Sequence, residues 1–595
     1  MCRIAGLYNP SMPAKAIEAI VKKMCTVQKH GGPDDEGVFT CAANHLVLGH
    51  RRLSIIDLST AGHQPMAYAN GRYQVTYNGE LYNYIELKET LKKAGCLFTT
   101  ASDTEVILAA FATWGVAAFK EFNGMFAFAI WDNVTGQIYL VRDGGGIKPL
   151  YFAHTKEGLA FASEVRAFKQ VPYLLTPHVN WQVYLMAYGH LPEPITTLKE
   201  VQPLKKGWYL EYNIFTGHAR QEAFTRSCYI EKISDRETAI SLVQQYLSAA
   251  VKRHLLSDAP IGVFLSGGLD SSIIAQLANK EQPNLNTISL FFDDHQYSEK
   301  KYQDMVQSGL QGNQYQYLLK EEVFHADLPG IISAMDLPCC DGINTWFISK
   351  YARECGLKAV LSGIGGDELY GGYPSFNRIA TALQVQQHLP DALLRAGRFA
   401  GIKKLRRFCY LSIKGSVGMY LFLRGQFIPH DIAQYLNCSE TEVWRILEEQ
   451  PLLPDIANLT AKNQASWLEV NLYMQNQLLR DADVMSMAHG LEIRVPFLDA
   501  AFLKLSLQIC SSIKYAGAFN KQLLIDCFKA SLPEAVWNRP KMGFSFPFKD
   551  WLGRDQYADS HTSTKNAAYH RQFVTGKLHW SQFLTVFLIE NNNNA

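Results

Sequence analysis

The 595-residue chain lacks the features that would place a protein at a membrane or on nucleic acid. Its longest apolar runs, such as 583–588, are far shorter than the roughly 20 apolar residues that cross a bilayer, and the N-terminus has no apolar signal-peptide region. The formal net charge is only +2, without a Lys/Arg-rich stripe, so neither an anionic membrane nor a nucleic acid is an expected partner. We expect a soluble, cytoplasmic protein.

The 12 cysteines form no Cys-x-x-Cys pair, which argues against a zinc site and against a secreted disulfide framework. Most of them should be small core residues. Cys2 differs, because removal of Met1 would leave its thiol beside its own α-amine, a base with a pKa of about 8. That arrangement is typical of N-terminal nucleophiles, and an ordinary buried cysteine is the alternative.

The most informative stretch is residues 266–272, Ser-Gly-Gly-Leu-Asp-Ser-Ser. An apolar segment of strand type, 259–265, precedes it, and a helix is expected to follow. The glycines let successive backbone N–H groups point to one place, the hydroxyls add donors, and a helix N-terminus favours an anion, so this loop can bind phosphate. No Lys follows the glycines, which separates it from the Gly-x-x-x-x-Gly-Lys loop.

A second Gly-rich loop, Ser-Gly-Ile-Gly-Gly-Asp-Glu, occupies residues 362–368. Its Asp367 and Glu368, together with Asp270 of the first loop, predict a Mg²⁺ site, since Mg²⁺ usually binds one or two carboxylates plus substrate phosphates. Strand candidates alternate with helices, which predicts a parallel, doubly wound sheet with ligands at the carboxyl ends of its strands. The strand candidates are 259–265, 286–292 and 357–361, and the helix before them is 237–256.

The N-terminal region predicts an antiparallel α+β layer rather than alternating units. Strand-like stretches at 2–8, 50–56 and 73–80 and a strand-turn-strand signal at 125–142 surround helical patterns at 82–94 and 103–114. We predict four segments along the chain: a first domain at 1–205, a linker at 206–235, a second domain at 236–560 and a tail at 561–595 that is partly disordered at its Asn-rich end.

Five motifs of the first domain resemble the glutaminase domain of class II amidotransferases: Cys2, Arg-Leu-Ser-Ile (52–55), Tyr-Asn-Gly-Glu (77–80), Ser-Asp-x-Glu (102–105) and Asn-Gly-Met-Phe-Ala-Phe (123–128). The resemblance implies an αββα N-terminal-nucleophile fold in which Cys2 attacks glutamine. It implies that Asn78 and Gly79 hold the oxyanion, a role for preorganised donors. The implied glutamine-binding residues are Arg52, Leu53, Ile55, Ile56, Glu80 and Asp103.

The segment 142–151 also resembles that family, but Gly144 and Gly145 replace larger residues common there. Three consecutive glycines predict a floppier turn. Because the family has this turn near the passage between its active sites, we expect a less tightly sealed route for ammonia.

The two Gly-rich loops, with segments 479–489, 492–499 and 539–544, resemble the synthetase half of glutamine-hydrolysing asparagine synthetases. The resemblance spans residues 2 to about 553 and implies an α/β parallel-sheet ATP-pyrophosphatase domain with a helical C-terminal part, acting in asparagine biosynthesis. It implies ATP and Mg²⁺ as cofactors and an acyl-adenylate from which ammonia displaces AMP. The implied ATP-binding residues are Leu265, Ser266, Gly267, Gly268, Asp270, Ser271, Ser272, Leu290, Ser362, Gly363 and Lys541, and the metal ligands are Asp270 and Asp367.

One position departs from this family. Enzymes that amidate aspartate typically carry an acid where this chain has Ile364, and an apolar replacement changes which ligands a pocket tolerates. Aspartate is therefore the default acceptor, with Glu368 as a candidate substitute for the acid. Two alternatives stay open: amidation or cyclisation of another carboxylate on a sugar, peptide or specialised metabolite, and a non-catalytic sensor of glutamine or ATP. The oligomeric state also stays open, with a homodimer as one option.

Overall fold

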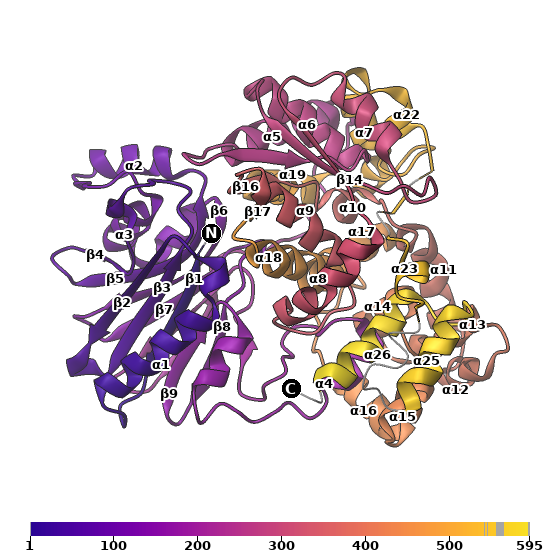
Figure 1. The fold of residues 1–595 in the computed structure, drawn as a ribbon, viewed down its shortest axis with the longest axis horizontal. Coiled ribbons are helices and arrows are strands. Elements are labelled where there is room, and N and C mark those ends of the chain that lie inside the picture. The colour runs from indigo at the N-terminus through magenta and orange to yellow at the C-terminus, as the bar shows by residue number, and fades with distance from the viewer. Residues whose placement is uncertain (1, 541, 544–545, 555–563, 593–595) are drawn as a thin grey trace.

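The computed structural model describes residues 2–540, 542–543, 546–554 and 564–592. Figure 1 shows an N-terminal domain, coloured indigo to purple, beside a larger C-terminal part. Two sheets form the first domain and a third sheet lies in the C-terminal part. Within the described ranges, no helix is both long and apolar enough to span a membrane.

The N-terminal domain contains two antiparallel six-stranded sheets. The first has the order β10-β8-β9-β1-β3-β2, with β1 Arg3–Tyr8, β2 Asp35–Cys41, β3 Leu46–Arg52, β8 Tyr151–Thr155, β9 Gly158–Ala162 and β10 Gln202–Pro203. The second has the order β12-β11-β7-β6-β5-β4, with β4 Met66–Tyr68, β5 Tyr73–Leu81, β6 Gly124–Asp132, β7 Gln137–Arg142, β11 Trp208–Asn213 and β12 Ala219–Ala223.

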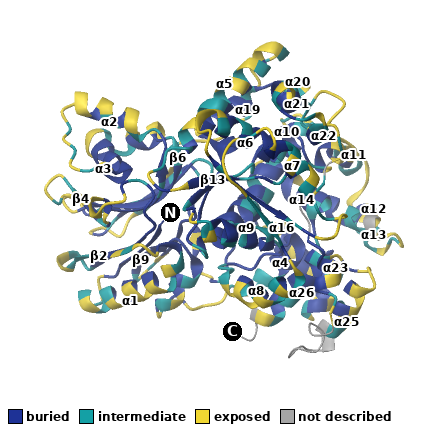
Figure 2. Cartoon of the chain, turned by 45° about the horizontal axis from the view of Figure 1, so that its top comes forward, coloured by how far each residue is buried: buried dark blue, intermediate teal, exposed yellow. Residues whose placement is uncertain are grey.

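Helices cover the outer faces of both sheets: α1 (Ala14–Val27) packs on β1 and β3, and α3 (Asp103–Trp114) packs on β5 beside α2 (Tyr84–Lys93). Side chains alternate along β1 as the strand period requires, so that Ile4 joins the core between the sheets and Ala5 joins the core under α1. Figure 2 shows α1 and α2 buried on their inner sides and exposed on their outer sides. The predicted αββα architecture is confirmed.

Strands β11 and β12 continue the second sheet to Ala223, so sheet structure extends beyond 205 into the segment expected as a linker. A helix then begins at Arg236, where the Asp235 side chain accepts a hydrogen bond from the Thr238 N–H at 2.7 Å. That bond satisfies one of the free donors of the first helical turn. The predicted start of the second domain near 236 coincides with this helix.

The third sheet is parallel, with the order β15-β14-β13-β16-β17. Helices α5 and α6 lie above it in Figure 1, and α9 and α18 lie below it. The predicted parallel sheet is therefore confirmed, and it gains strands β15 and β17 that the sequence pattern did not reveal. The bounds are β13 Ile261–Phe264, β14 Asn286–Phe291, β15 Gln314–Leu318, β16 Ala359–Leu361, β17 Glu492–Arg494, α5 Arg236–His254, α6 Leu269–Glu281, α9 Ile343–Glu354 and α18 Leu479–Met487.

The rest of the C-terminal part is mainly helical, as predicted. It includes α4 Trp181–Tyr188, contributed by the first half of the chain, and α7 Lys300–Gln307, α8 Glu321–Ala334, α10 Gly366–Tyr370, α11 Ser375–His388, α14 Gly415–Arg424, α17 Ala461–Leu468, α19 Ala500–Gln508, α21 Gln522–Phe528, α22 Glu534–Trp537, α23 Phe548–Trp551, α25 Thr564–Val574 and α26 Trp580–Asn592. Between α17 and α18 the helix continues as a π-helical segment, Glu469–Leu478.

The expected tail is structured over most of its described length. Helix α26 contacts α4, and its Phe583 and Leu584 are buried. Apolar residues of this region therefore fill a core rather than forming a free extension. Residues 593–595, part of the Asn-rich end for which we expected disorder, lie outside the described residues.

Candidate active sites

Cys2 and Asn78 meet between the two sheets of the N-terminal domain, since β1 and β5 bring them together. The main-chain nitrogen of Cys2 donates to Asn78 Oδ1 at 3.2 Å, and its Sγ lies 4.0 Å from the carbonyl oxygen of Leu53. Burial raises the pKa of the Cys2 thiol to about 11. The thiol is therefore neutral at pH 7 and needs a base to become a nucleophile.

Asn78 offers a free donor beside this thiol. Its side chain is fully buried, and its Nδ2 has no hydrogen-bond partner among the described residues. A buried unsatisfied amide is costly, and a developing oxyanion would satisfy it. Gly79 leaves no room for a side chain, because a Cβ there would lie 2.2 Å from the carbonyl oxygen of Met125.

Of the predicted glutamine-binding residues, Leu53, Arg52 and Glu80 interact with Cys2, and the charged ones are already engaged by the protein. The Arg52 guanidinium donates to the carbonyl oxygens of Ser59, at 2.8 Å, and Asp57. Asp103 accepts from the Tyr77 hydroxyl and the Leu81 N–H, both at 3.0 Å. Leu53 and Ile55 are buried and Ile56 is half-buried.

Glu80 lies near the parallel sheet of the C-terminal part. Its Oε2 lies 3.6 Å from Arg494, which ends β17 and whose Nε donates to Glu492 at 2.5 Å. Burial, followed by Glu492, raises the pKa of Glu80. Burial is also the largest single effect on Glu492, but Arg494, the chain's N-terminal amine and Lys148 together lower its pKa. The carbonyl oxygen of Arg494 also accepts the Ser362 N–H at 2.8 Å, so one arginine connects Glu80 of the first domain to the second Gly-rich loop.

We expect Arg494→Gln to destabilise the protein by about 3–5 kcal/mol, because it leaves two buried carboxyl groups without their cation. The variant would raise the pKa of Glu492 above its unfolded value. The folded state then binds more protons than the unfolded chain above about pH 4.5, so the deficit should grow as pH rises. Thermal unfolding at pH 5.5 and pH 8 measures this, with Arg220→Gln, an exposed partner of Glu211, as the control. Equal melting temperatures for Arg494→Gln and wild type would contradict the assignment.

In the C-terminal part, the first Gly-rich loop forms a tight turn at the start of α6. The hydroxyls of Ser266 and Ser271 lie 2.9 Å apart, and Gly268 N–H donates to Ser266 Oγ at 3.3 Å. Ser272 Oγ donates to Gly268 O at 2.7 Å and is buried. Gly267 adopts φ 78°, a left-handed conformation that favours glycine.

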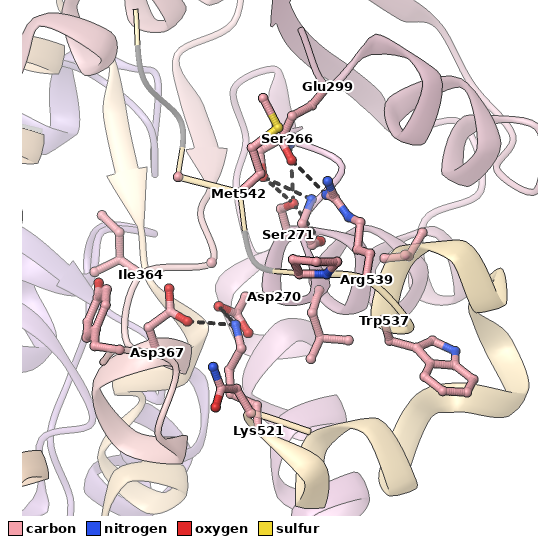
Figure 3. Close-up of a pocket in the computed structure, with 18 of the residues that line it drawn as sticks. Ser266, Asp270, Ser271, Glu299, Ile364, Asp367, Lys521, Trp537, Arg539 and Met542 are labelled. Carbon is pink, nitrogen blue, oxygen red and sulfur yellow. Dashed lines mark hydrogen bonds and ion pairs between the residues drawn. The ribbon is translucent and has the colours of Figure 1, made fainter. Parts of the chain in front are cut away.

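Arg539, which we did not assign from the sequence, binds the backbone of this loop. Its guanidinium donates to the carbonyl oxygen of Gly267 at 3.0 Å and pairs with Glu299 at 2.7 Å (Figure 3). The position predicted to contact the adenylate, Lys541, lies outside the described residues. Its place in the site therefore stays a prediction.

Glycines of the second Gly-rich loop pack directly against Asp270 of the first. A Cβ at Gly363 would lie 2.9 Å from Asp270 Cβ, and one at Gly366 would lie 2.5 Å from Asp270 Cγ. This contact brings Asp270 close to Asp367. Lys521, just before α21, binds both: its Nζ lies 2.8 Å from Asp270 Oδ2 and 2.7 Å from Asp367 Oδ1 (Figure 3).

A cavity of about 850 Å³ opens between these loops and the C-terminal helices. Seven predicted residues line it: Ser266, Gly268, Asp270, Ser271, Ser362, Gly363 and Asp367. Aromatic residues that the sequence did not indicate form other walls, namely Tyr373, Tyr473, Phe519, Trp537, Phe546, Phe548 and Trp580. The predicted phosphate-binding and carboxylate residues thus converge on one large cavity.

An adjoining cavity of about 220 Å³ lies at the carboxyl ends of β13 and β14 and contains the predicted Leu265 and Leu290. Ser266, Ser362 and Ile364 line both cavities. A pocket with apolar walls and a few polar groups is typical of small-molecule sites.

Glu368, the candidate substitute for an acid at position 364, lines the larger cavity, and both of its carboxylate oxygens already accept hydrogen bonds from the protein. Its Oε2 accepts the Gly365 N–H at 3.0 Å and its Oε1 accepts the Tyr373 hydroxyl at 2.7 Å. Burial, followed by Asp367, raises the pKa of Glu368 to about 7. Both oxygens of Glu368 serve the turn at the start of α10.

An apolar cluster joins the two sites. Leu53, Met125 and Ile147 of the first domain pack in the same core as Met474 and Ile493 of the C-terminal part. Such packing excludes water and is a suitable environment for a small neutral molecule.

The glycine turn expected to be floppy is bonded on several sides. Asp143 accepts the N–H groups of Ile147 and Lys148, at 3.0 and 2.9 Å, and Gln475 Nε2 donates to the carbonyl oxygen of Gly146 at 3.1 Å. The bond from Gln475 ties the turn to the π-helical segment Glu469–Leu478.

Comparisons with known proteins match both parts of the chain. A glutamine amidotransferase domain model matches residues 1–224, and an asparagine synthase model matches residues 242–578. Asparagine synthetase [glutamine-hydrolyzing] 1 of Bacillus subtilis (strain 168) is 31% identical over 568 residues, covering 93% of this chain and 88% of that protein. Asparagine synthetase B [glutamine-hydrolyzing] of Escherichia coli (strain K12) is 25% identical over 564 residues, covering 92% and 82%. The chain therefore belongs to the asparagine synthase family.

Proposed function

We propose that the protein is a glutamine-dependent asparagine synthetase. It hydrolyses glutamine to ammonia in the N-terminal domain, adenylates the side-chain carboxylate of aspartate with ATP in the second, and amidates it to give asparagine, glutamate, AMP and pyrophosphate. The observation that carries this proposal is the pair of sites in one chain, Cys2 with the free Asn78 donor and the Asp270–Lys521–Asp367 cluster, joined by an apolar core.

In the glutaminase site, removal of Met1 would turn the nitrogen of Cys2 into an amine. This amine takes the thiol proton, and the sulfur then attacks the glutamine carboxamide. Asn78 orients the amine through Oδ1 and donates from Nδ2 to the oxyanion, while Gly79 keeps the strand close to β6. Arg52 and Asp103 supply opposite charges for the α-carboxylate and α-ammonium of glutamine.

In the synthetase site, the serine hydroxyls and backbone of 266–272 bind phosphate, and Lys521 neutralises charge between the α- and β-phosphates. Asp270 and Asp367 fit Mg²⁺, because their oxygens already converge on a single cation at 2.8 and 2.7 Å. The described residues form no group of three or more candidate ligands, which suits an ion that is also held by phosphates. Bound Mg²⁺ would neutralise the departing pyrophosphate.

The first experiment measures AMP, pyrophosphate and asparagine with ATP, Mg²⁺ and either glutamine or ammonia, with and without aspartate. We expect aspartate-dependent AMP in equal amount to asparagine. No stimulation by aspartate, with glutaminase intact, would reject aspartate and favour another carboxylate acceptor, as Ile364 suggests. Inactivity of both sites would favour the glutamine or ATP sensor. A homodimer and a cytoplasmic location stay predictions.

A further inference from the structure

The smaller cavity contains two acids that the mechanism above does not use. Asp341 lies just before α9 and Asp481 lies on α18, and both line the 220 Å³ cavity together with Ile364. Asp341 and Ile364 also line the larger cavity. The two carboxyl groups therefore lie where the larger cavity meets the smaller one, beside Ile364.

These acids have no cation in the cavity. Asp481 is only 7% exposed, and its Oδ2 accepts a hydrogen bond from Cys339 Sγ at 3.1 Å. Asp341 accepts from the Gly342 N–H at 2.9 Å and from Gln477 Nε2 at 3.0 Å. Among the described residues that line this cavity there is no Lys or Arg.

The surroundings of Asp481 disfavour its charged, carboxylate form. Burial, followed by Asp341, raises the pKa of Asp481 to about 7, against smaller opposing effects of Arg480 and the Cys339 hydrogen bond. Arg480 donates instead to the carbonyl oxygen of Leu191 at 3.0 Å and lines a separate small cavity. Two adjacent acids in an apolar site ionise more readily when a cation lies between them.

An ammonium group suits this site better than a metal ion. Apart from the two acids, the side-chain oxygens of the lining belong to the neutral residues Ser266, Asn344, Thr345 and Ser362, and the rest of the lining is largely apolar. The described residues form no group of three or more candidate metal ligands. Mg²⁺ needs several oxygens or waters, whereas an ammonium needs only a few acceptors. Both substrates of the amidation, aspartate and ammonia, present nitrogen that is cationic when protonated.

We propose that Asp341 and Asp481 form a subsite for an ammonium group. This proposal rests on the proposed function, because that function puts the acceptor carboxylate beside the subsite. Two sources supply this chemistry: the amino group of the acceptor amino acid, and ammonium derived from glutamine. In either case the subsite provides negative charge that Ile364 does not.

Asp481→Asn keeps the shape of the side chain and removes its charge. We expect the KM for one nitrogen-bearing substrate to rise by at least about 10-fold, as for loss of one charge-assisted contact, with the KM for ATP within about 2-fold of wild type. A higher KM for aspartate at saturating ammonia assigns the subsite to the acceptor. A higher KM for ammonium at saturating aspartate assigns it to the incoming nitrogen.

Asp341→Asn is the second variant and Asp336→Asn the matched control, because Asp336 is a buried carboxyl with a raised pKa that binds the Val165 and Arg166 N–H groups and lines neither cavity. Thermal unfolding verifies that each variant is folded. If both folded variants keep the KM for aspartate and for ammonium within about 3-fold of wild type, the subsite is rejected.

A second measurement does not depend on turnover. Thermal unfolding of the wild type in ammonium chloride is compared with sodium chloride at equal ionic strength. Selective binding raises the melting temperature in ammonium, and Asp481→Asn should lose that difference. An ammonium effect shared by wild type and variant overturns the subsite. A wild type without synthetase activity that keeps an Asp481-dependent ammonium effect overturns the proposed function and supports the subsite.

Discussion

Cys2→Ala is expected to lower glutamine-dependent asparagine formation by at least about 10³-fold, while ammonia-dependent formation stays within about 2-fold of wild type. The physical reason is that only the sulfur of Cys2 can form the covalent intermediate with glutamine, and free ammonia bypasses that step. Alanine at position 2 still permits removal of Met1. The measurement is asparagine produced per minute with each nitrogen source.

Cys96→Ala controls for loss of a thiol, since Cys96 is half-buried and outside both sites. It should keep both activities. Retention of glutamine-dependent synthesis in Cys2→Ala would show that another group attacks glutamine, and a parallel loss with ammonia would mean that the substitution disturbs the fold. Separation of the two activities is the expected result.

Lys521→Met is expected to lower aspartate-dependent AMP formation by about 10²–10³-fold, the usual cost of removing one preorganised charge donor from a transition state. Lys521 is nearly buried between Asp270 and Asp367, which outweigh the effect of burial and raise its pKa, so it stays a cation at neutral pH. Without it, two carboxylates repel the phosphates that they should help to bind. Pyrophosphate release in single-turnover conditions measures the step.

Glutaminase activity provides the internal control, since Lys521→Met should leave Cys2 and Asn78 unchanged. Lys529→Met is the matched variant, because Lys529 forms an exposed pair with Asp526 and should have no effect. A loss of less than about 5-fold in Lys521→Met would remove this lysine from the chemistry.

Local patterns predicted most of the fold and the two Gly-rich loops that line the larger cavity. Strand alternation and a helical period located β5, α3 and α5 to within a few residues, and the glycine spacing located both phosphate-side loops. The family resemblance implied that Cys2 and Asn78 share a site, and the structure has the Cys2 nitrogen 3.2 Å from Asn78 Oδ1. Strand β17 was missed because three residues are too few to show a period.

The residues that were missed gain their roles through contacts distant in sequence. Lys521 lies in a polar stretch without periodicity, and only folding brings it to Asp270. The same holds for Arg539 at Gly267 and for Asp481 beside Asp341. Glu80 was expected at glutamine, but its described partner is Arg494 of the other part of the chain. A single sequence shows the type of these side chains and not their neighbours.

The continuous helix from Ala461 to Met487, with its π-helical middle, connects the second Gly-rich loop, the apolar cluster and the smaller cavity. Ser466 binds the carbonyl oxygen of Glu368 at 2.8 Å, Met474 joins the apolar cluster and Asp481 lines the smaller cavity. Because each residue advances an α-helix by about 100°, the winding of the middle segment sets the angle between the two ends. The angle between the two ends of the helix therefore depends on how many residues the middle segment contains as well as on which residues they are. A single insertion or deletion there would rotate Asp481 away from Asp341, although every side chain of both sites would still be present in the sequence.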